Sequence, residues 1–344
     1  MDRNGLSRRG VLKVGAAVAS ALAMPTILSG RVFAAKGTKT LNMQLGWLAN
    51  GNQLGEIVAK QMGYFEEEGI DFRLQPGGPN IDGLAMVASG QYEMGVMPSS
   101  PSIMLAASQH IPIRCFGVGF QEHPFAFYSL PKAPVREPKD LIGKRVGIPQ
   151  TTKILLTALL KKHGIPEDKV KIQITGSELT PLVTGQVDVI TAWQTNTTNL
   201  KILGPDAIRM RLWDVGIKLY ANNYYAQADR LKEDPELYAK FMKASSRGWA
   251  LAREDSAKAA GLLVKELPNL DLAGETDAAA VAVAVTFNAD TKEYGWGHFR
   301  RNLWQDQIAL YDGLGQFSAG APKLDDVIDG SILAATKEDR AKIG

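Results

Sequence analysis

The stretches Val87-Ala88-Ser89-Gly90-Gln91-Tyr92-Glu93-Met94 and Leu182-Val183-Thr184-Gly185-Gln186-Val187-Asp188-Val189 follow one pattern. In each stretch a helical segment ends at a glycine, and a strand begins after the glutamine that follows it. A second pair lies upstream of these stretches, because Gly46 to Gly63 and Gly147 to Gly164 have the same length and contain a loop, a helix and a final glycine. Two matches in the same order predict two α/β lobes of similar topology.

Strands and helices alternate along the first copy of this pattern. We expect strands over residues 41–45, 70–74, 92–97 and 113–120, and helices over residues 52–62, 82–89 and 101–109. This alternation predicts a mostly parallel sheet that is covered by helices. The second copy repeats it with a helix inside 147–164 and a strand over 170–174.

Two extended apolar runs, residues 124–130 and 220–229, lie at the two ends of the second copy. We interpret them as strands that cross between the lobes. Lobe one then comprises residues 35–127 and 221–344, with helices over 235–253, 256–267, 275–287 and 303–314, and lobe two comprises residues 128–220. Because ligands bind beyond the carboxyl ends of strands in such sheets, we expect a ligand cleft between the lobes.

The first 34 residues are typical of an export signal. Arg8-Arg9 precedes an apolar run over residues 14–24, and Val32-Phe33-Ala34 places small residues where a signal peptidase cleaves. The run is shorter than the ~20 strongly apolar residues that a spanning helix needs. The arginine pair resembles the twin-arginine export motif, so residues 1–34 predict a signal peptide and a mature protein in the periplasm.

Removing residues 1–34 changes the charge of the chain. They hold five basic residues and one acidic residue, so 34 of the 39 basic and 35 of the 36 acidic residues remain, a net charge of −1. This balance does not favour nucleic acid as a partner. The single cysteine, Cys115, excludes an internal disulfide. The four histidines lie far apart in the sequence without metal-ligand spacing, so we expect neither a metal site nor a cofactor.

Several motifs resemble a known family. Gly46-Trp47-Leu48-Ala49-Asn50 is followed by Ala59-Lys60-Gln61-Met62-Gly63-Tyr64-Phe65-Glu66-Glu67-Glu68-Gly69-Ile70, and Asp140 to Gly147 opens the second copy. These segments resemble the substrate-binding proteins of ABC importers for nitrate, sulfonates, taurine and the pyrimidine precursor of thiamine. The resemblance covers about residues 38–320. It implies the two-lobed type II periplasmic binding protein fold and delivery of a small molecule to a permease in the inner membrane, and we expect a monomer.

A branch of this family resembles pyrimidine synthases, which carry a cysteine-rich motif and a reactive histidine. A chain with one cysteine does not have that motif, so we expect a binding protein and not an enzyme.

The loops that follow the strands supply the candidate ligand-binding residues. They are rich in amide and hydroxyl side chains and contain aromatic rings, which suit a mostly apolar slot with a few orienting hydrogen bonds. The candidates are Trp47, Asn50, Asn80, Asp82, Ser99, Ser100, Glu122, Gln150, Thr151, Thr152, Trp193, Asn196, Asn223 and Tyr224.

The charges in these loops separate the ligand classes. Lys153 and His123 are their only basic residues, whereas Asp82, Glu122 and Glu178 are acidic. Acidic groups beside a desolvated anion are unfavourable, so the loops favour an aromatic heterocycle such as a thiamine pyrimidine precursor. A sulfonate, taurine or nitrate remains the alternative, because the serines and threonines before two helices offer backbone amides to an anion.

Overall fold

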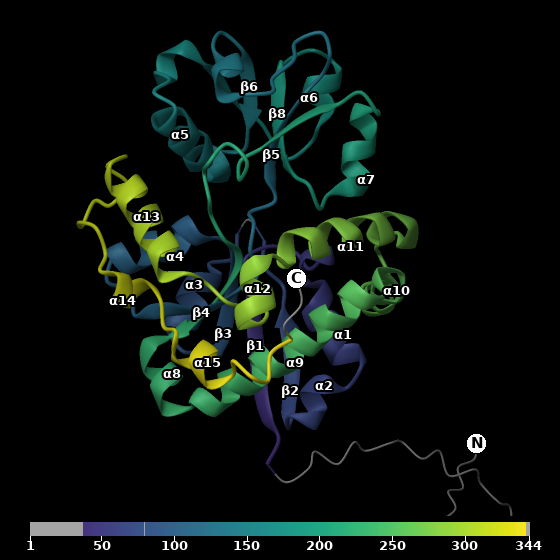
Figure 1. Cartoon of the computed structure of the whole chain (residues 1–344), viewed down its shortest axis with the longest axis vertical. Helices are drawn as coiled ribbons and strands as arrows, with labels where there is room; N and C mark the ends of the chain where they lie inside the picture. Colours follow the sequence, from purple (N-terminus) through teal and green to yellow (C-terminus); the bar gives the residue numbers. More distant parts are fainter. Residues whose placement is uncertain (1–36, 79, 342–344) are drawn as a thin grey trace, which may run out of the picture. The chain divides into compact units, whose positions relative to one another are not determined.

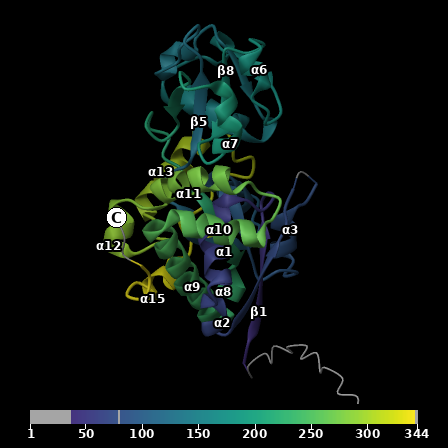
Figure 2. The ribbon, with the colours of Figure 1, turned by 90° about the vertical axis from the view of Figure 1, so that its right-hand side faces the viewer.

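The computed structural model describes residues 37–78 and 80–341. The predicted signal peptide, residues 1–34, therefore lies outside the described residues. The described chain folds around two five-stranded sheets, and we call the parts built on them lobe one and lobe two (Figures 1 and 2).

The sheet of lobe one has the order β2-β1-β3-β10-β4. Its strands are β1 (Lys39–Leu45), β2 (Ile70–Gln75), β3 (Met94–Ser99), β4 (Ile113–Phe120) and β10 (Ala221–Gln227). Strand β1 runs parallel to β2 and β3, whereas β10 runs antiparallel to β3 and β4.

The sheet of lobe two has the order β7-β6-β8-β5-β9. Its strands are β5 (Phe125–Ser129), β6 (Arg145–Ile148), β7 (Lys171–Ile174), β8 (Val189–Trp193) and β9 (Ile208–Arg211). Here β6 is parallel to β7 and β8, and β5 is antiparallel to β8 and β9. The two sheets therefore have the same topology, with β10 in lobe one occupying the place of β5 in lobe two.

Helices cover both sheets. Lobe one carries α1 (Leu54–Gln61), α2 (Tyr64–Glu67), α3 (Gly83–Ala88) and α4 (Ser100–Ser108), and lobe two carries α5 (Lys153–Lys162), α6 (Thr180–Val183) and α7 (Thr197–Leu200). The segment after β10 adds α8 (Ala228–Glu233), α9 (Pro235–Glu254), α10 (Ser256–Glu266), α11 (Leu272–Thr286), α12 (Ala289–Tyr294), α13 (Arg301–Asp312), α14 (Leu324–Val327) and α15 (Ser331–Ala335). Figure 1 shows these later helices beside the strands of lobe one.

Helices α1 and α9 approach each other through two glycines. A Cβ on Gly248 would lie 1.9 Å from the carbonyl oxygen of Gly55, and a Cβ on Gly55 would overlap the ring of Trp249. The small residues let the long helix α9 pack directly on α1. The loop after β1 leads into α1, so this packing also positions that loop.

The chain passes between the lobes twice. We expected the first segment of lobe one to end at residue 127, but strand β5 of lobe two already begins at Phe125. The first crossing therefore lies between β4 and Phe125. The second crossing lies between β9 and β10. The two crossings touch, because the backbone N–H of His123 donates to the carbonyl of Leu219 at 3.1 Å.

Candidate functional site

The carboxyl ends of five strands, two in lobe one and three in lobe two, surround one cavity of about 470 Å³. Lobe one contributes the turn after β1, the end of β3 and the start of β10, and lobe two contributes the turns after β6, β7 and β8. This is the edge at which open α/β sheets bind ligands. The lining residues are Gly46, Trp47, Leu48, Asn50, Asn52, Gln53, Val96, Pro98, Pro149, Thr151, Thr152, Gly176, Ser177, Glu178, Trp193, Asn196 and Asn222.

Two indole rings from opposite lobes line this cavity. Trp47 follows β1 and is 48% exposed, whereas Trp193 ends β8 and is half-buried. Aromatic faces of this kind stack flat rings. The arrangement suits a planar ligand that contacts both lobes at once.

Hydrogen-bonded asparagine and glutamine residues line the cavity on the side of lobe one. The Asn50 side chain accepts from the backbone N–H of Asn52 at 2.8 Å, and the Gln53 side chain accepts from the backbone N–H of Asn50 at 3.3 Å, which caps the turn before α1. Asn222 donates from Nδ2 to the carbonyl of Asn52 at 2.6 Å. These mutual bonds hold the amides in place before any ligand arrives.

Asn222 has a left-handed backbone, with φ of +50°, inside strand β10. Asparagine tolerates this region better than other residues that have a Cβ, and such conformations gather at ligand sites. The unusual backbone accompanies a side chain that lines the cavity and bonds the turn after β1.

The exposed Glu178 brings a carboxylate to this cavity. Glu178 is the only charged residue among the described residues that line it. Lys153, the basic residue expected near the site, instead pairs with Glu167 at 2.9 Å. Glu122 pairs with Arg211 and does not line the cavity. The described lining residues therefore offer a carboxylate and neutral polar groups to a ligand, and no lysine or arginine side chain.

His123 packs against the indole ring of Trp193, which lines the cavity. Its ring lies edge-on to Trp193, with the ring centroids 5.2 Å apart. Its Nδ1 accepts from the backbone N–H of Phe125 at 3.2 Å, so Nε2 carries the proton and donates to Ser99 Oγ at 2.6 Å. Burial lowers the pKa of His123 to about 3, and the imidazole is therefore neutral at physiological pH.

Six of the fourteen residues predicted for the site line this cavity together. Trp47 and Asn50 follow β1, while the other four come from lobe two: Thr151, Thr152, Trp193 and Asn196. Lining the cavity does not by itself show contact with a ligand, so the role of these six residues in binding stays a prediction.

Three further candidates are exposed or act locally and do not line the cavity. Asn80 and Gln150 are exposed. Asp82 accepts from the backbone N–H of Ala85 at 3.0 Å and caps α3, a common role for aspartate at this position.

The other five candidates are bonded inside the protein. Glu122 has its partner in Arg211, and Ser99 bonds to His123, as described above. The fully buried Ser100 donates to Gln307. Asn223 and Tyr224 are fully buried in β10, where Asn223 donates to the carbonyl of Met97 at 3.2 Å and Tyr224 donates to Glu56.

The cavity is also lined by residues that the sequence-based set of candidates did not include. Asn52, Gln53 and Asn222 line the cavity, and Ser177 and Glu178 join them from the turn after β7. Strand β10 runs away from the cleft, so its first residues reach the cavity and Tyr224 lies deeper. The signal that identifies Asn222 is its place at the start of a strand that follows a crossing.

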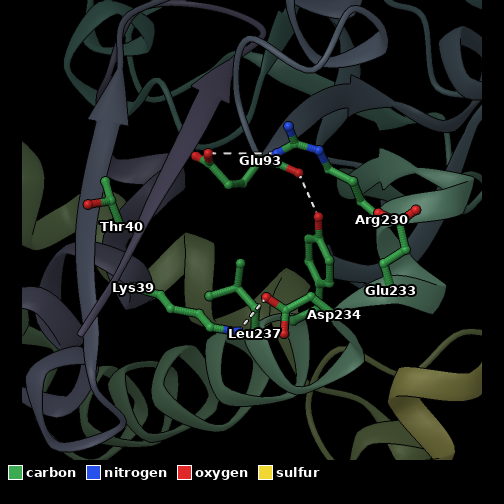
Figure 3. Close-up of a pocket in the computed structure, with 8 residues that line it drawn as sticks. Lys39, Thr40, Glu93, Arg230, Glu233, Asp234 and Leu237 are labelled. Atoms are coloured by element: carbon green, nitrogen blue, oxygen red, sulfur yellow. Dashed lines mark hydrogen bonds and ion pairs between the residues drawn. The ribbon is translucent and has the colours of Figure 1, made fainter. Parts of the chain in front are cut away.

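A separate cavity of about 370 Å³ lies at the opposite end of the sheet, where β1 begins (Figure 3). Four of its five charged groups already pair with one another. Lys39 lies 2.7 Å from Asp234, and Arg230 lies 3.7 Å from Glu93. Such paired charges leave little to offer a ligand, so we place the ligand site at the other end of the strands.

The described residues form neither a metal site nor a membrane-spanning helix. Within residues 37–78 and 80–341, no group of three or more His, Cys, Asp or Glu side chains is placed to hold a metal ion. In the same residues, no helix has the length and apolar character that crossing a membrane requires.

Comparisons with known proteins place the chain in a family. Residues 50–259, more than half of the chain, match the family model described as NMT1/THI5 like. The riboflavin-binding protein RibY of Chloroflexus aurantiacus is 26% identical over 290 residues, covering 81% of this chain and 82% of that protein. The formylaminopyrimidine-binding protein of Halalkalibacterium halodurans is 25% identical over 288 residues, covering 80% and 85%.

A further relative is named as an enzyme. The 4-amino-5-hydroxymethyl-2-methylpyrimidine phosphate synthase of Legionella pneumophila is 25% identical over 239 residues, covering 67% of this chain and 74% of that protein.

Among solved structures, the periplasmic aliphatic sulphonate binding protein SsuA of Escherichia coli superimposes with a TM-score of 0.64 at 15% identity, covering 84% of this chain and 92% of SsuA. This last likeness identifies a periplasmic binding protein fold. The family match, which covers more than half of the chain, shows that the chain belongs to the NMT1/THI5-like family.

Proposed function

We propose that this protein is the extracytoplasmic solute-binding component of an ABC importer. It captures a flat, amino-substituted aromatic heterocycle, such as a thiamine pyrimidine precursor, by closure of the two lobes and delivers it to the permease. The observation that carries the proposal is the lining of the cleft, where Trp47 and Trp193 come from opposite lobes and Glu178 is the only charged group among the described lining residues.

Each of these groups has a chemical task with such a ligand. The indole rings stack on the faces of the heterocycle, and a carboxylate accepts hydrogen bonds from an exocyclic amine or a ring N–H. The names of two relatives support the same ligand class, since riboflavin and a formylaminopyrimidine are both flat nitrogen heterocycles.

The second candidate is an anion such as a sulfonate, taurine or nitrate. It rests on the N-terminus of α5, because Thr152 immediately precedes this helix and lines the cavity. The free N–H groups at a helix N-terminus favour an anion by about 0.3–1 kcal/mol. Glu178 opposes it, and no lysine or arginine side chain among the described lining residues offsets that carboxylate.

An enzyme that uses the same cleft is the candidate from another class, and the relative named as a synthase motivates it. The single cysteine, Cys115, is buried in β4, away from the cavity. A turnover assay of the purified protein with the cofactor that such synthases use, read out as a pyrimidine product, tests this candidate. We expect no product above the blank.

We also propose that residues 1–34 direct export through the twin-arginine route. The pathway reads the guanidinium pair and not charge alone, so replacing Arg8 and Arg9 with lysine should leave the precursor in the cytoplasm. Cell fractionation of that double variant checks this, and normal periplasmic accumulation would favour the general secretory route.

The ligand class is tested by removing the charge of Glu178. We expect Glu178→Gln to weaken binding of 4-amino-5-hydroxymethyl-2-methylpyrimidine about three- to thirtyfold, because a hydrogen bond to a charged group contributes about 1.5–3 kcal/mol and the amide keeps part of it. Glu254→Gln at the exposed end of α9 is the matched control.

Thermal shift reads out this experiment, because a ligand at 100 times its Kd adds about 2.7 kcal/mol of stability. The same plate should include taurine, an alkanesulfonate and nitrate. If Glu178→Gln instead strengthens binding of one of these anions and leaves the pyrimidine unbound, the anion candidate replaces the heterocycle.

A further inference from the structure

A second cavity of about 340 Å³ adjoins the ligand cavity. The two share three lining residues, Asn50, Asn52 and Asn196, so they meet at these side chains. Like the first cavity, the second takes its lining from both lobes. A ligand that passes these three side chains would enter the second cavity.

The chemistry of the second cavity differs from that of the first. Most of its lining side chains are asparagine or threonine, and no tryptophan, lysine or arginine is among the described residues that line it. Amides and hydroxyls both donate and accept hydrogen bonds, as the hydroxyl groups of a polyol do. Its two charged residues, Asp271 and Glu275, are acidic, which disfavours an anionic group there.

Two buried polar atoms at this cavity have no hydrogen-bond partner. Thr195 is 7% exposed, and its Oγ1 is unpartnered. Asn52 Oδ1 is likewise buried without a partner. Buried polar atoms are nearly always bonded, and each exception calls for an explanation. A hydroxylated ligand chain would supply the missing partners.

Lobe two contacts lobe one beside the second cavity. The hydroxyl of Thr197 in α7 donates to the carbonyl of Gly274 in α11 at 3.0 Å. Lys201, just after α7, pairs with Asp277 of α11 at 2.9 Å. This contact joins the two lobes next to the cavity, and it occupies the nearby lysine.

From these observations we infer that the ligand is a flat heterocycle that carries an uncharged polyhydroxylated chain. The ring lies in the first cavity and the chain lies in the second, where Thr195 and Asn52 bond its hydroxyl groups. This inference rests on the proposed function, because it assumes that a flat heterocycle occupies the first cavity. It adds the chemical class of the rest of the ligand.

Three flavins of graded structure test the inference. Riboflavin has the ring and a neutral polyol chain, lumiflavin has the ring with a methyl group in its place, and FMN ends the chain in a phosphate. We expect the exported protein to bind riboflavin at least tenfold more tightly than lumiflavin. FMN should bind more weakly than riboflavin, since its phosphate would face Asp271 and Glu275. Quenching of flavin fluorescence measures all three affinities.

Thr195→Val separates the chain from the ring. The change keeps the shape of the side chain and removes an unpartnered hydroxyl, so the stability of the free protein should not fall. Riboflavin affinity should fall about five- to tenfold, whereas lumiflavin affinity should stay within twofold. Thr184→Val, on the exposed end of α6, is the matched control and should change neither affinity.

The possible outcomes distinguish this inference from the proposed function. Equal binding of riboflavin and lumiflavin, or an equal loss of both in Thr195→Val, would overturn the inference. Binding of 4-amino-5-hydroxymethyl-2-methylpyrimidine without binding of either flavin would also overturn it, while leaving the proposed function intact. If neither the flavins nor the pyrimidine bind, the proposed function itself fails.

Discussion

Trp193 is the residue on which the stacking geometry can be tested most cleanly. It ends β8, lies half-buried against His123 and lines the ligand cavity. Trp193→Ala should weaken binding of the heterocycle ten- to a hundredfold, at about 1.4 kcal/mol per tenfold change. Titration and urea unfolding of the same variant measure affinity and stability separately.

Trp213→Ala is the matched control for this change. Trp213 is also half-buried in lobe two, under the ammonium of Lys218, but does not line the ligand cavity. A stability loss of about 3–5 kcal/mol in Trp193→Ala with unchanged affinity would mean that the ring only covers the core.

Glu56 is a buried carboxyl that makes stability depend on pH. It is 1% exposed in α1, accepts from the hydroxyl of Tyr224, and burial raises its pKa from 4.5 to about 7. The folded state therefore holds this proton more tightly than the unfolded state. The stabilisation is fully present below pH 4.5 and is lost as pH rises through 7.

Glu56→Gln should remove this dependence, because the amide stays neutral and still accepts from Tyr224. Between pH 4.5 and pH 8 the wild-type protein should lose roughly 3 kcal/mol of unfolding free energy relative to the variant. Urea unfolding at both pH values measures the difference. Parallel pH profiles of the two proteins would contradict the assignment.

The residue scale is also where prediction from sequence was weakest. Asp82 and Tyr224 have the right chemistry for a ligand, yet Asp82 caps α3 and Tyr224 bonds Glu56 inside the core. A loop can be placed from periodicity, but the direction of one side chain depends on the register of its strand. The left-handed backbone of Asn222 shows this, since no alternation rule gives it.

At the scale of elements, the repeated sequence motifs foretell the topology well. The matching stretches 87–94 and 182–189 end in β3 and β8, which hold the same place in the two sheets. The antiparallel positions of β5 in the sheet of lobe two and of β10 in the sheet of lobe one were not predicted. They depend on pairing between strands that lie far apart in the sequence. Strand β9 was missed because its four residues, two of them arginines, give no strong alternation.

The contact between α7 and α11 yields a prediction about closure. Gly274 of α11 faces α7, and a Cβ there would lie 2.0 Å from Thr198 Oγ1. Gly274→Ala should therefore push the lobes apart and weaken ligand binding about three- to tenfold by reducing the population of the closed form.

Gly261→Ala, in α10, is the control for the helix propensity of alanine. A Cβ at Gly261 meets nothing within 4 Å, so this variant should gain up to about 1 kcal/mol of stability and bind normally. Calorimetric titration of both variants makes the comparison. Equal affinities would show that the α7–α11 contact does not control binding.

At the scale of the whole molecule, the proposed ligand site takes its lining from both lobes. Neither lobe holds more than one of the two cavity tryptophans, and Glu178, the only charged residue among the described residues of the lining, comes from lobe two. The division into lobes followed from the repeated motifs and the two extended runs. The adjoining second cavity did not, because it forms where segments distant in sequence, such as α7 and α11, come together.

Calorimetric titration of the exported protein with 4-amino-5-hydroxymethyl-2-methylpyrimidine, riboflavin and taurine tests the central claim most directly. The account predicts saturable one-to-one binding of at least one heterocycle, with taurine at least about tenfold weaker, because Glu178 opposes its sulfonate and no lysine or arginine among the described lining residues compensates. Saturable binding of taurine more tightly than either heterocycle would contradict it.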